Sequence, residues 1–338
     1  MITSRPFGLL SDGTPVTCWR LEQEGAYVDI TDYGAAIVSI VVPDRNHQPA
    51  DVVLGYEDAG GYEQNKGCLG ATVGRHANRI GGGWFTLNGR TYHLETNNGP
   101  NHLHGGTDSY YRRMFRGEAE GDTLRLFLHS PDGDQGYPGN LELTVSYTFA
   151  HRRLEVRFEA VCDQDTVLNL TNHSYFDLSC GADPMGQLLT LAAERFCEND
   201  ENTLPTGRLL PVEDTPFDFR QEKPVGRDLA AEDVQLLRCG GYDHNFALDN
   251  GGVLTPCAIL RSPETGIRMV LSTDLPGVQL YSANSLRGTG KGSRVHGKNG
   301  AVCLEPQFFP NALHNPQWEQ PVLRAGEKFD RHIVYQFE

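Results

Sequence analysis

The sequence predicts an all-β protein, a large many-stranded antiparallel β-sandwich with few short helices. Short runs in which apolar and polar residues alternate with period two recur along the chain, as expected of strands with one buried face. The 38 glycines and 19 prolines lie between these runs, where turns are needed. So many short strands are typical of a sandwich rather than of a helical or mixed fold.

Two hairpins are the clearest elements of this pattern. Apolar residues alternate through 141–149 and again through 154–158, which predicts an antiparallel hairpin with one buried face. A second hairpin is predicted from 84–87 and 90–94, because the intervening Asn88-Gly89 tolerates the positive φ angles of a tight type I′ turn.

The remaining elements are shorter runs of the same kind and one helix. The helix is predicted at 228–237, with Asp228 as its N-cap. No repeat, low-complexity tract or linker divides the chain, so we predict one continuous domain over residues 1–338. The further predicted strands are 27–31, 36–42, 124–129, 166–170, 188–192, 253–260, 267–273, 278–281, 302–305 and 332–337.

Composition excludes several classes of partner. The 29 basic and 44 acidic residues give a formal charge of −15, which repels nucleic acid and anionic membrane surfaces. The eight cysteines form no Cys-x-x-Cys pair, so a zinc knuckle or redox motif is not predicted. No apolar stretch is long enough to cross a bilayer and the first residues do not resemble a secretion signal, so we expect a cytoplasmic protein.

Two polar segments in the first third are candidate binding segments. Residues 74–80 carry two arginines and Asn78, which either donate hydrogen bonds to a polar ligand or tie down their own loop. His102 and His104 are expected on the same face of a strand, as a possible metal pair. No third ligand is evident, so a ligand-contacting or structural role is favoured for these histidines.

Three further residues could carry chemistry, each beside a structural alternative. His173 follows an apolar strand and is either a site residue or a ring packed between Tyr175 and Phe176. Asp243 is either an acceptor for hydroxyl groups or a turn former. Glu305 ends an apolar strand, where burial would make it a base unless an arginine pairs with it for structure.

Taken together and in this order, these motifs resemble the aldose 1-epimerase (galactose mutarotase) family over most of the chain. Each motif alone is weak, but the ordered set is specific. The motifs are Gly-Arg-x-Ala-Asn-Arg-Ile at 74–80, Leu-His-Gly-Gly at 103–106, Asn-His-Ser-Tyr-Phe at 172–176, Asp-His-Asn-Phe at 243–246 and Leu-Glu-x-Gln at 304–307.

The resemblance implies an enzyme that interconverts the α and β anomers of a free aldohexose such as galactose or glucose. It implies a galactose mutarotase-like sandwich with an open sugar cleft, a monosaccharide substrate, and no cofactor or metal. Glu305 would be the general base and His173 the general acid. By the same resemblance, the sugar would be bound by Asn78, Arg79, His104, Tyr175, Asp243 and Gln279.

Anomer exchange needs one base and one acid, because the C1 hydroxyl loses a proton while the ring oxygen gains one. A carboxylate and an imidazole suit these tasks. Two departures from the family pattern carry expectations: Asp177 should alter the pKa of nearby His173, and Pro306 should hold Glu305 extended. Two other functions compete, a non-catalytic sugar-binding protein and a glycosidase that pairs Glu305 with Asp243.

Overall fold

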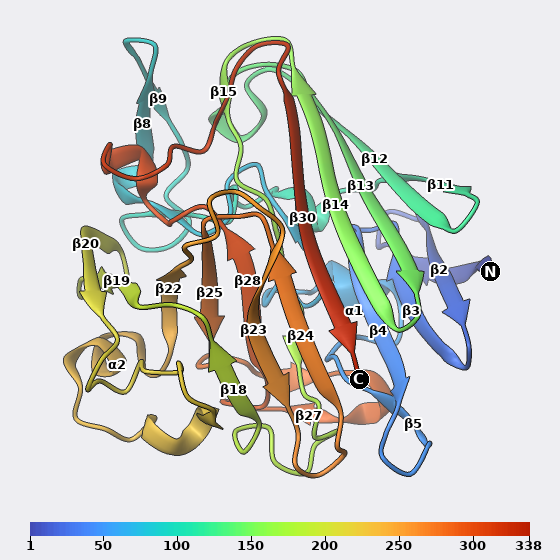
Figure 1. The fold of residues 1–338 in the computed structure, drawn as a ribbon. Coiled ribbons are helices and arrows are strands. Elements are labelled where there is room, and N and C mark those ends of the chain that lie inside the picture. Colours follow the sequence, from blue (N-terminus) through green and yellow to red (C-terminus); the bar gives the residue numbers. More distant parts are fainter.

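The computed structural model describes all residues, 1–338, and its regular structure consists almost entirely of antiparallel strands (Figure 1). Three sheets dominate, with nine, six and five strands. The nine-stranded sheet contains, in spatial order, β11 (Arg116–Glu120), β12 (Thr123–Ser130), β13 (Leu141–Ala150), β14 (Arg153–Cys162), β30 (Lys328–Phe337), β24 (Arg268–Thr273), β23 (Thr255–Arg261), β18 (Leu188–Leu191) and β21 (Lys223–Pro224).

The other two large sheets complete the architecture. The six-stranded sheet contains β17 (Tyr175–Phe176), β28 (Val302–Gln307), β25 (Gly277–Tyr281), β22 (Asp243–Ala247), β19 (Arg195–Asn199) and β20 (Pro205–Pro211). The five-stranded sheet contains β1 (Ile2–Leu9), β2 (Pro15–Gln23), β3 (Ala26–Thr31), β4 (Ala36–Pro43) and β5 (Pro49–Asp51).

Five two-stranded ribbons and two short helices occupy the connections. The helices are α1 (Ala59–Glu63) and α2 (Val234–Cys239), and neither is long and apolar enough to cross a membrane. The ribbons pair β6 (Thr72–Val73) with β16 (Thr171–Asn172), β7 (Arg79–Ile80) with β10 (His102–Leu103), β8 (Trp84–Leu87) with β9 (Arg90–His93), β15 (Thr166–Val167) with β29 (Val322–Leu323), and β26 (Gly288–Thr289) with β27 (Val295–His296).

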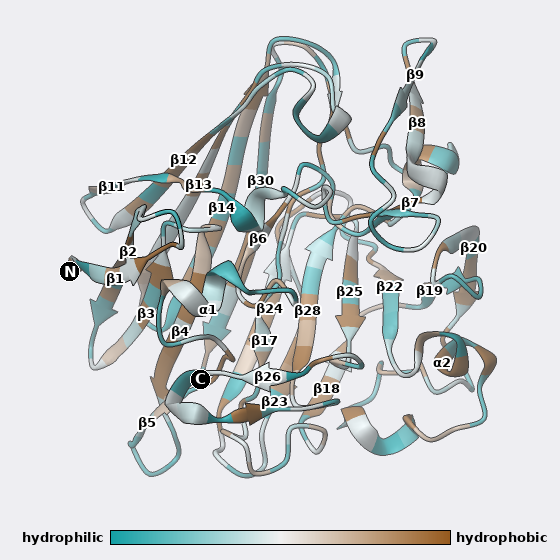
Figure 2. Ribbon diagram, turned by 180° about the vertical axis from the view of Figure 1, so that it is seen from behind, coloured by the Kyte–Doolittle hydropathy of each residue, from teal (hydrophilic) through white to brown (hydrophobic).

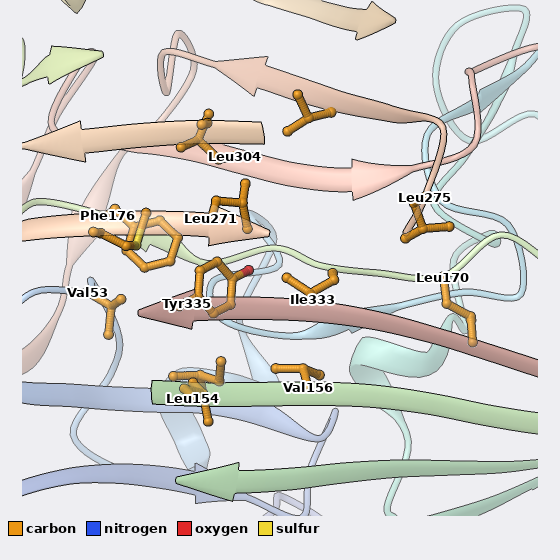
Figure 3. Packing of buried hydrophobic residues seen from close by; sticks show 14 of the residues in the cluster. Val53, Leu154, Val156, Leu170, Phe176, Leu271, Leu275, Leu304, Ile333 and Tyr335 are labelled. Atoms are coloured by element: carbon orange, nitrogen blue, oxygen red, sulfur yellow. The ribbon is translucent and has the colours of Figure 1, made fainter. Parts of the chain in front are cut away.

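The core lies between the faces of the six- and nine-stranded sheets. Phe176 of β17 packs on Tyr335 of β30, with ring centroids 5.1 Å apart. Leu304 of β28 and Leu271 of β24 belong to the same cluster of buried side chains, drawn in Figure 3. Alternation along each strand therefore sends one set of residues into this core and the other set to the opposite face. The predicted all-β sandwich is confirmed.

Both predicted hairpins are confirmed, and every other predicted strand overlaps an observed one. Four of these strands are shorter than predicted; β18 and β24 each lack one terminal residue, and β15 and β23 have a structural reason. β15 ends at Val167, because the chain then pairs Asn169 with His76 in an isolated bridge. β23 begins at Thr255, because Val253 closes a turn by donating its backbone N–H to the carbonyl of Asn250.

The prediction of one helix over 228–237 is wrong at its start. α2 begins at Val234, and its N-cap is Asp233, whose carboxylate accepts hydrogen bonds from the backbone of Gln235 and Leu236. Asp228 instead accepts from the ammonium of Lys223 at 2.7 Å. Lys223 is almost wholly buried, so its charge needs this partner and the carboxylate is not free to cap a helix.

Strand register gathers the polar residues of the six-stranded sheet on its outer face. Gln279 of β25 lies directly opposite Glu305 of β28 and Asn245 of β22, and the three strands run side by side in Figure 2. Leu304 points into the core, so its neighbour Glu305 points the other way. The outer face of β22, β25 and β28 is thus the floor of a polar site.

Candidate active site

A cavity of about 410 Å³ opens over this floor. Seven of the eight predicted site residues line it, although they come from five separate parts of the chain. Gln279 does not line the cavity and reaches it through Asp243. The lining residues among those predicted are Asn78, Arg79, His104, His173, Tyr175, Asp243 and Glu305.

Glu305 and His173 face each other at the bottom of the cavity. The Nε2 atom of His173 lies 3.6 Å from Oε2 of Glu305, and the residues are 5% and 2% exposed. Burial raises the pKa of Glu305 well above its usual range, and the charge of Asp243 adds to the rise while Arg79 opposes it. Burial lowers the pKa of His173 to about 4. Burial therefore favours the uncharged form of both groups.

Aromatic packing sets the orientation of the His173 ring. The ring stacks on Tyr175, with centroids 5.0 Å apart and planes 11° apart, and its edge meets Tyr281. Tyr175 is held in turn by its hydroxyl, which donates to the carbonyl of Gly67 at 3.0 Å. His173 thus packs against Tyr175 and is also a residue of the site, so the two alternatives do not exclude each other.

His104 is fixed by the backbone of Asn78. The Asn78 N–H donates to Nδ1 of His104 at 3.1 Å, and the His104 N–H donates to the carbonyl of Asn78 at 3.1 Å. Burial lowers the pKa of His104 well below its usual value, and the neighbouring His173 and Arg79 lower it further. Because Nδ1 accepts, we assign the proton of the neutral ring to Nε2, which makes this atom a hydrogen-bond donor.

A charged pair forms one wall of the cavity. Arg79 Nη1 lies 3.4 Å from Asp243 Oδ2, and Arg79 Nε donates to the side chain of Asn98 at 3.1 Å. The amide of Gln279 donates to Asp243 Oδ1 at 2.7 Å. Both oxygens of Asp243 therefore face donors, which keeps the carboxylate in place as an acceptor rather than as a turn former.

In the first candidate binding segment, residues 74–80, one arginine belongs to the scaffold and the other to the site. Arg75 is 2% exposed and donates to the carbonyls of Ser130, Pro138 and Gly139, so in this residue the loop-tying alternative is correct. Arg79, four residues later, turns to the cavity.

His102 and His104 do not share a face. His104 has a φ of +53°, which ends the strand after Leu103 and turns the two rings apart. His102 is bonded to the carbonyl of Glu95 at 2.7 Å and to the hydroxyl of Tyr137 at 2.8 Å, so both of its nitrogens are in use. A His-x-His metal pair is therefore ruled out by the geometry.

Asp177 and Pro306 depart from the family pattern, and the effect expected of Asp177 on the pKa of His173 is wrong. Asp177 is buried, pairs with Arg294 and accepts from the hydroxyl of Ser179 at 2.5 Å. Its charge is thus neutralised by Arg294, and the pKa of His173 is set by burial, a backbone hydrogen bond and Asp243 instead. Pro306 lies within β28 and keeps Glu305 in extended backbone, as expected.

Among the cavity-lining residues that sequence reasoning missed, two contact predicted site residues directly. Tyr281 lines the cavity and contacts the His173 ring by its edge. Period-two spacing from Gln279 would have placed it on the same face. Asn98 lines the cavity and holds Arg79, but it lies in an Asn-Asn-Gly-Pro stretch that is typical of any turn.

Comparisons with known proteins agree with the fold and show the family. A family model described as aldose 1-epimerase matches residues 17–336. The galactose mutarotase of Mus musculus is 38% identical over 99% of this chain and 98% of its own length, and the aldose 1-epimerase of Haemophilus influenzae is 34% identical over 97% of each. The crystal structure of galactose 1-epimerase from Lactobacillus acidophilus is 29% identical and superimposes with a TM-score of 0.88, covering 100% of this chain and 98% of that one. The chain belongs to the aldose 1-epimerase family, and is thus a carbohydrate isomerase that interconverts the anomers of aldoses.

Proposed function

We propose that this protein catalyses the mutarotation of a free aldohexose such as galactose or glucose, with Glu305 as general base and His173 as general acid. The observation that carries the assignment of roles is the pair itself: a carboxylate and an imidazole 3.6 Å apart at the bottom of a polar cavity. One group that takes a proton and one that gives a proton are what ring opening requires.

The pair holds one exchangeable proton, and its position determines the reactive form. With the proton on Glu305 both groups are uncharged, whereas its transfer to Nε2 of His173 creates the carboxylate and the imidazolium together. Glu305 then removes the proton of the C1 hydroxyl while His173 protonates the ring oxygen, so the C1–O5 bond breaks and the open-chain aldehyde forms. Each positioned group contributes roughly 10²–10⁴ in rate.

Ring closure reverses the same transfers. After rotation about the C1–C2 bond the aldehyde presents its other face, and the C5 hydroxyl attacks the carbonyl carbon. His173 recovers its proton from that hydroxyl, and Glu305 returns one to the new C1 oxygen. The enzyme ends as it began, and the sugar has changed only its anomeric configuration.

The other residues of the cavity are assigned to sugar binding. Arg79 and the Nε2–H of His104 are donors, and the carboxylate of Asp243 is an acceptor held by two neighbours. Together with Asn78 and Tyr175 they suit a neutral polyol, whose hydroxyl groups both donate and accept. Gln279 lies outside the cavity lining and supports this set by donating to Asp243.

The geometry speaks against the glycosidase alternative. A glycosidase needs a second carboxyl group that acts as nucleophile, acid or base. Asp243 is the only other carboxylate lining the cavity, and both of its oxygens are bound by Arg79 and Gln279. A buried carboxyl opposite a buried imidazole is also more than a non-catalytic sugar-binding protein requires.

We further propose that the chain works as one domain in the cytoplasm. One cluster of buried side chains draws members from all three large sheets, which supports a single folding unit. All eight cysteines are unpaired in the structure, which is usual in a reducing compartment. Limited proteolysis that released a stable fragment with its own cooperative unfolding transition would contradict the single domain.

Polarimetry tests the activity and the roles together. Freshly dissolved α-galactose or α-glucose is followed at a pH where spontaneous mutarotation is slow, with wild-type protein and with Glu305→Gln. We expect wild type to accelerate the decay of rotation and the variant to do so far less. If wild type does not accelerate it while calorimetry still detects sugar binding, the sugar-binding protein is the correct alternative. Release of reducing sugar from an aryl glycoside would instead support the glycosidase.

A further inference from the structure

A third reactive side chain lies beside the Glu305–His173 pair and has no part in anomer exchange. Cys303 precedes Glu305 by two residues on β28, so the thiol and the carboxyl share one face of the strand. One nitrogen of His173, the sulfur of Cys303 and one carboxylate oxygen of Glu305 all lie within 4.8 Å of one another. A nitrogen, a sulfur and an oxygen donor therefore converge on one point.

These donors are buried and partly unpartnered. His173, Cys303 and Glu305 are at most 5% exposed. Neither Nδ1 of His173 nor Oε2 of Glu305 has a hydrogen-bond partner in the protein. Unpaired polar atoms at such depth are unusual unless a ligand, water or ion satisfies them. The cavity gives a route from solvent to His173 and Glu305, because both residues line it.

The donor set suits a cation that prefers sulfur and nitrogen. Zn²⁺ binds thiolate sulfur at about 2.3 Å and imidazole nitrogen or carboxylate oxygen at about 2.0–2.2 Å. Tetrahedral ligands at such lengths lie roughly 3.3–3.7 Å from one another. The present separations, up to 4.8 Å, therefore need to contract by at most about 1.5 Å. Three protein ligands would leave the fourth position for water or a sugar oxygen.

We propose that His173, Cys303 and Glu305 form a binding site for a thiophilic divalent cation such as Zn²⁺, and that the bound ion inhibits the enzyme. Binding releases the thiol proton of Cys303 and any proton on Glu305 to water, and nothing is oxidised or reduced. The ion occupies both groups to which we assign proton transfer, so it is a competitor of the reaction and not a cofactor. The inhibition rests on the proposed function, whereas the binding site itself does not.

Cobalt binding tests the site without reference to activity. Co²⁺ is titrated into the purified protein, and absorption is followed for the near-ultraviolet thiolate-to-cobalt band and the visible bands of a four-coordinate ion. We expect both at one equivalent, displaced by Zn²⁺, and we expect the thiolate band to vanish in Cys303→Ala and Cys303→Ser. Cys239→Ala is the matched control, because Cys239 also lines the cavity and is outside the cluster, so its band should persist.

Two spectroscopic outcomes would overturn the proposal. One is the absence of a thiolate band in wild type, a result that does not depend on any variant folding. The other is a band that survives both substitutions of Cys303, which would place the ion elsewhere.

An activity measurement then tests the inhibition. Mutarotation of galactose is followed against free Zn²⁺, with Mg²⁺ as an oxygen-preferring control. We expect Zn²⁺ to inhibit wild type, a chelator to restore the rate, and Cys303→Ala to need at least ~10-fold more Zn²⁺ because one of three ligands is gone. Equal sensitivity of wild type and Cys303→Ala would contradict the inhibition through this site. A protein that shows the cobalt band but no mutarotation would refute the proposed function and leave the ion site standing.

Discussion

The side chains of Glu305 and His173 have environments that shift their proton affinities in opposite directions, and this makes their substitution informative. Glu305→Gln and His173→Asn each keep the approximate shape of the residue and remove its exchangeable proton site. We expect each to lower the turnover number by at least ~10², because one proton-transfer group is lost. Calorimetry should show sugar affinity changed by only a few-fold. A variant that retains the wild-type rate would refute the role assigned to that residue.

Asp243 is expected to act on binding as well as on turnover. In Asp243→Ala the acceptor is lost and the guanidinium of Arg79 is left without its carboxylate. A hydrogen bond to a charged group contributes about 1.5–3 kcal/mol, so sugar affinity should fall roughly 10- to 100-fold. Isothermal calorimetry with galactose measures the change, and Asp249→Ala, an exposed carboxylate outside the cavity, is the control. Equal affinities for Asp243→Ala and wild type would place the sugar elsewhere.

At the level of single elements, the sequence predicted strands better than it predicted where they end. The hairpin of β13 and β14 followed from alternation alone, because one face of each strand is buried along its whole length. The start of α2 did not, because Asp228 and Asp233 are both good N-caps and the choice depends on Lys223, which is buried there only in the folded molecule.

The same limit applies to the loop segments of the site. Arg75 and Arg79 look alike in the motif, yet one is wholly buried in the scaffold and the other lines the cavity. Period-two spacing placed His102 and His104 on the same face of a strand, but the positive φ of His104 ends that spacing and turns its ring elsewhere. Family resemblance selected Arg79 and His104, whereas local pattern alone could not.

Arg75 connects three segments and is expected to matter for stability rather than for chemistry. Its guanidinium donates to carbonyls of Ser130, Pro138 and Gly139, and Arg75 does not line the cavity. Arg75→Leu leaves those buried carbonyls without a donor, at about 1–3 kcal/mol each, so we expect the free energy of unfolding to fall by about 3 kcal/mol or more. Urea denaturation measures it. Arg79→Leu is the matched control and should lose sugar binding with much less effect on stability; the reverse ranking would contradict the division of roles.

For the whole molecule, the site depends on a register that spans distant parts of the chain. Glu305, Gln279 and Asn245 come together only because β28, β25 and β22 are neighbours in one sheet. No local pattern encodes that order of strands, so the sequence predicted a sandwich but not which strands form the floor of the cavity. Two histidines outside the cavity lining, His76 and His244, are also wholly buried in the fold.

Buried neutral histidines should make the protein sensitive to acid. Burial lowers the pKa of His76 to about 3 and that of His244 to about 4, against about 6.5 in an unfolded chain. At a pH between the folded-state and unfolded-state pKa values, the unfolded chain binds protons that the folded protein does not. The contribution of these histidines to the free energy of unfolding is therefore complete above pH 6.5 and is lost as the pH falls toward 4. Each such histidine contributes a slope of about 1.4 kcal/mol per pH unit. The test is urea denaturation of wild type and His76→Leu at several pH values; the substitution removes a ring without hydrogen-bond partners. We expect the free energy of unfolding of the variant to fall less steeply with decreasing pH than that of wild type. Parallel slopes would mean that His76 does not titrate differently in the folded and unfolded states.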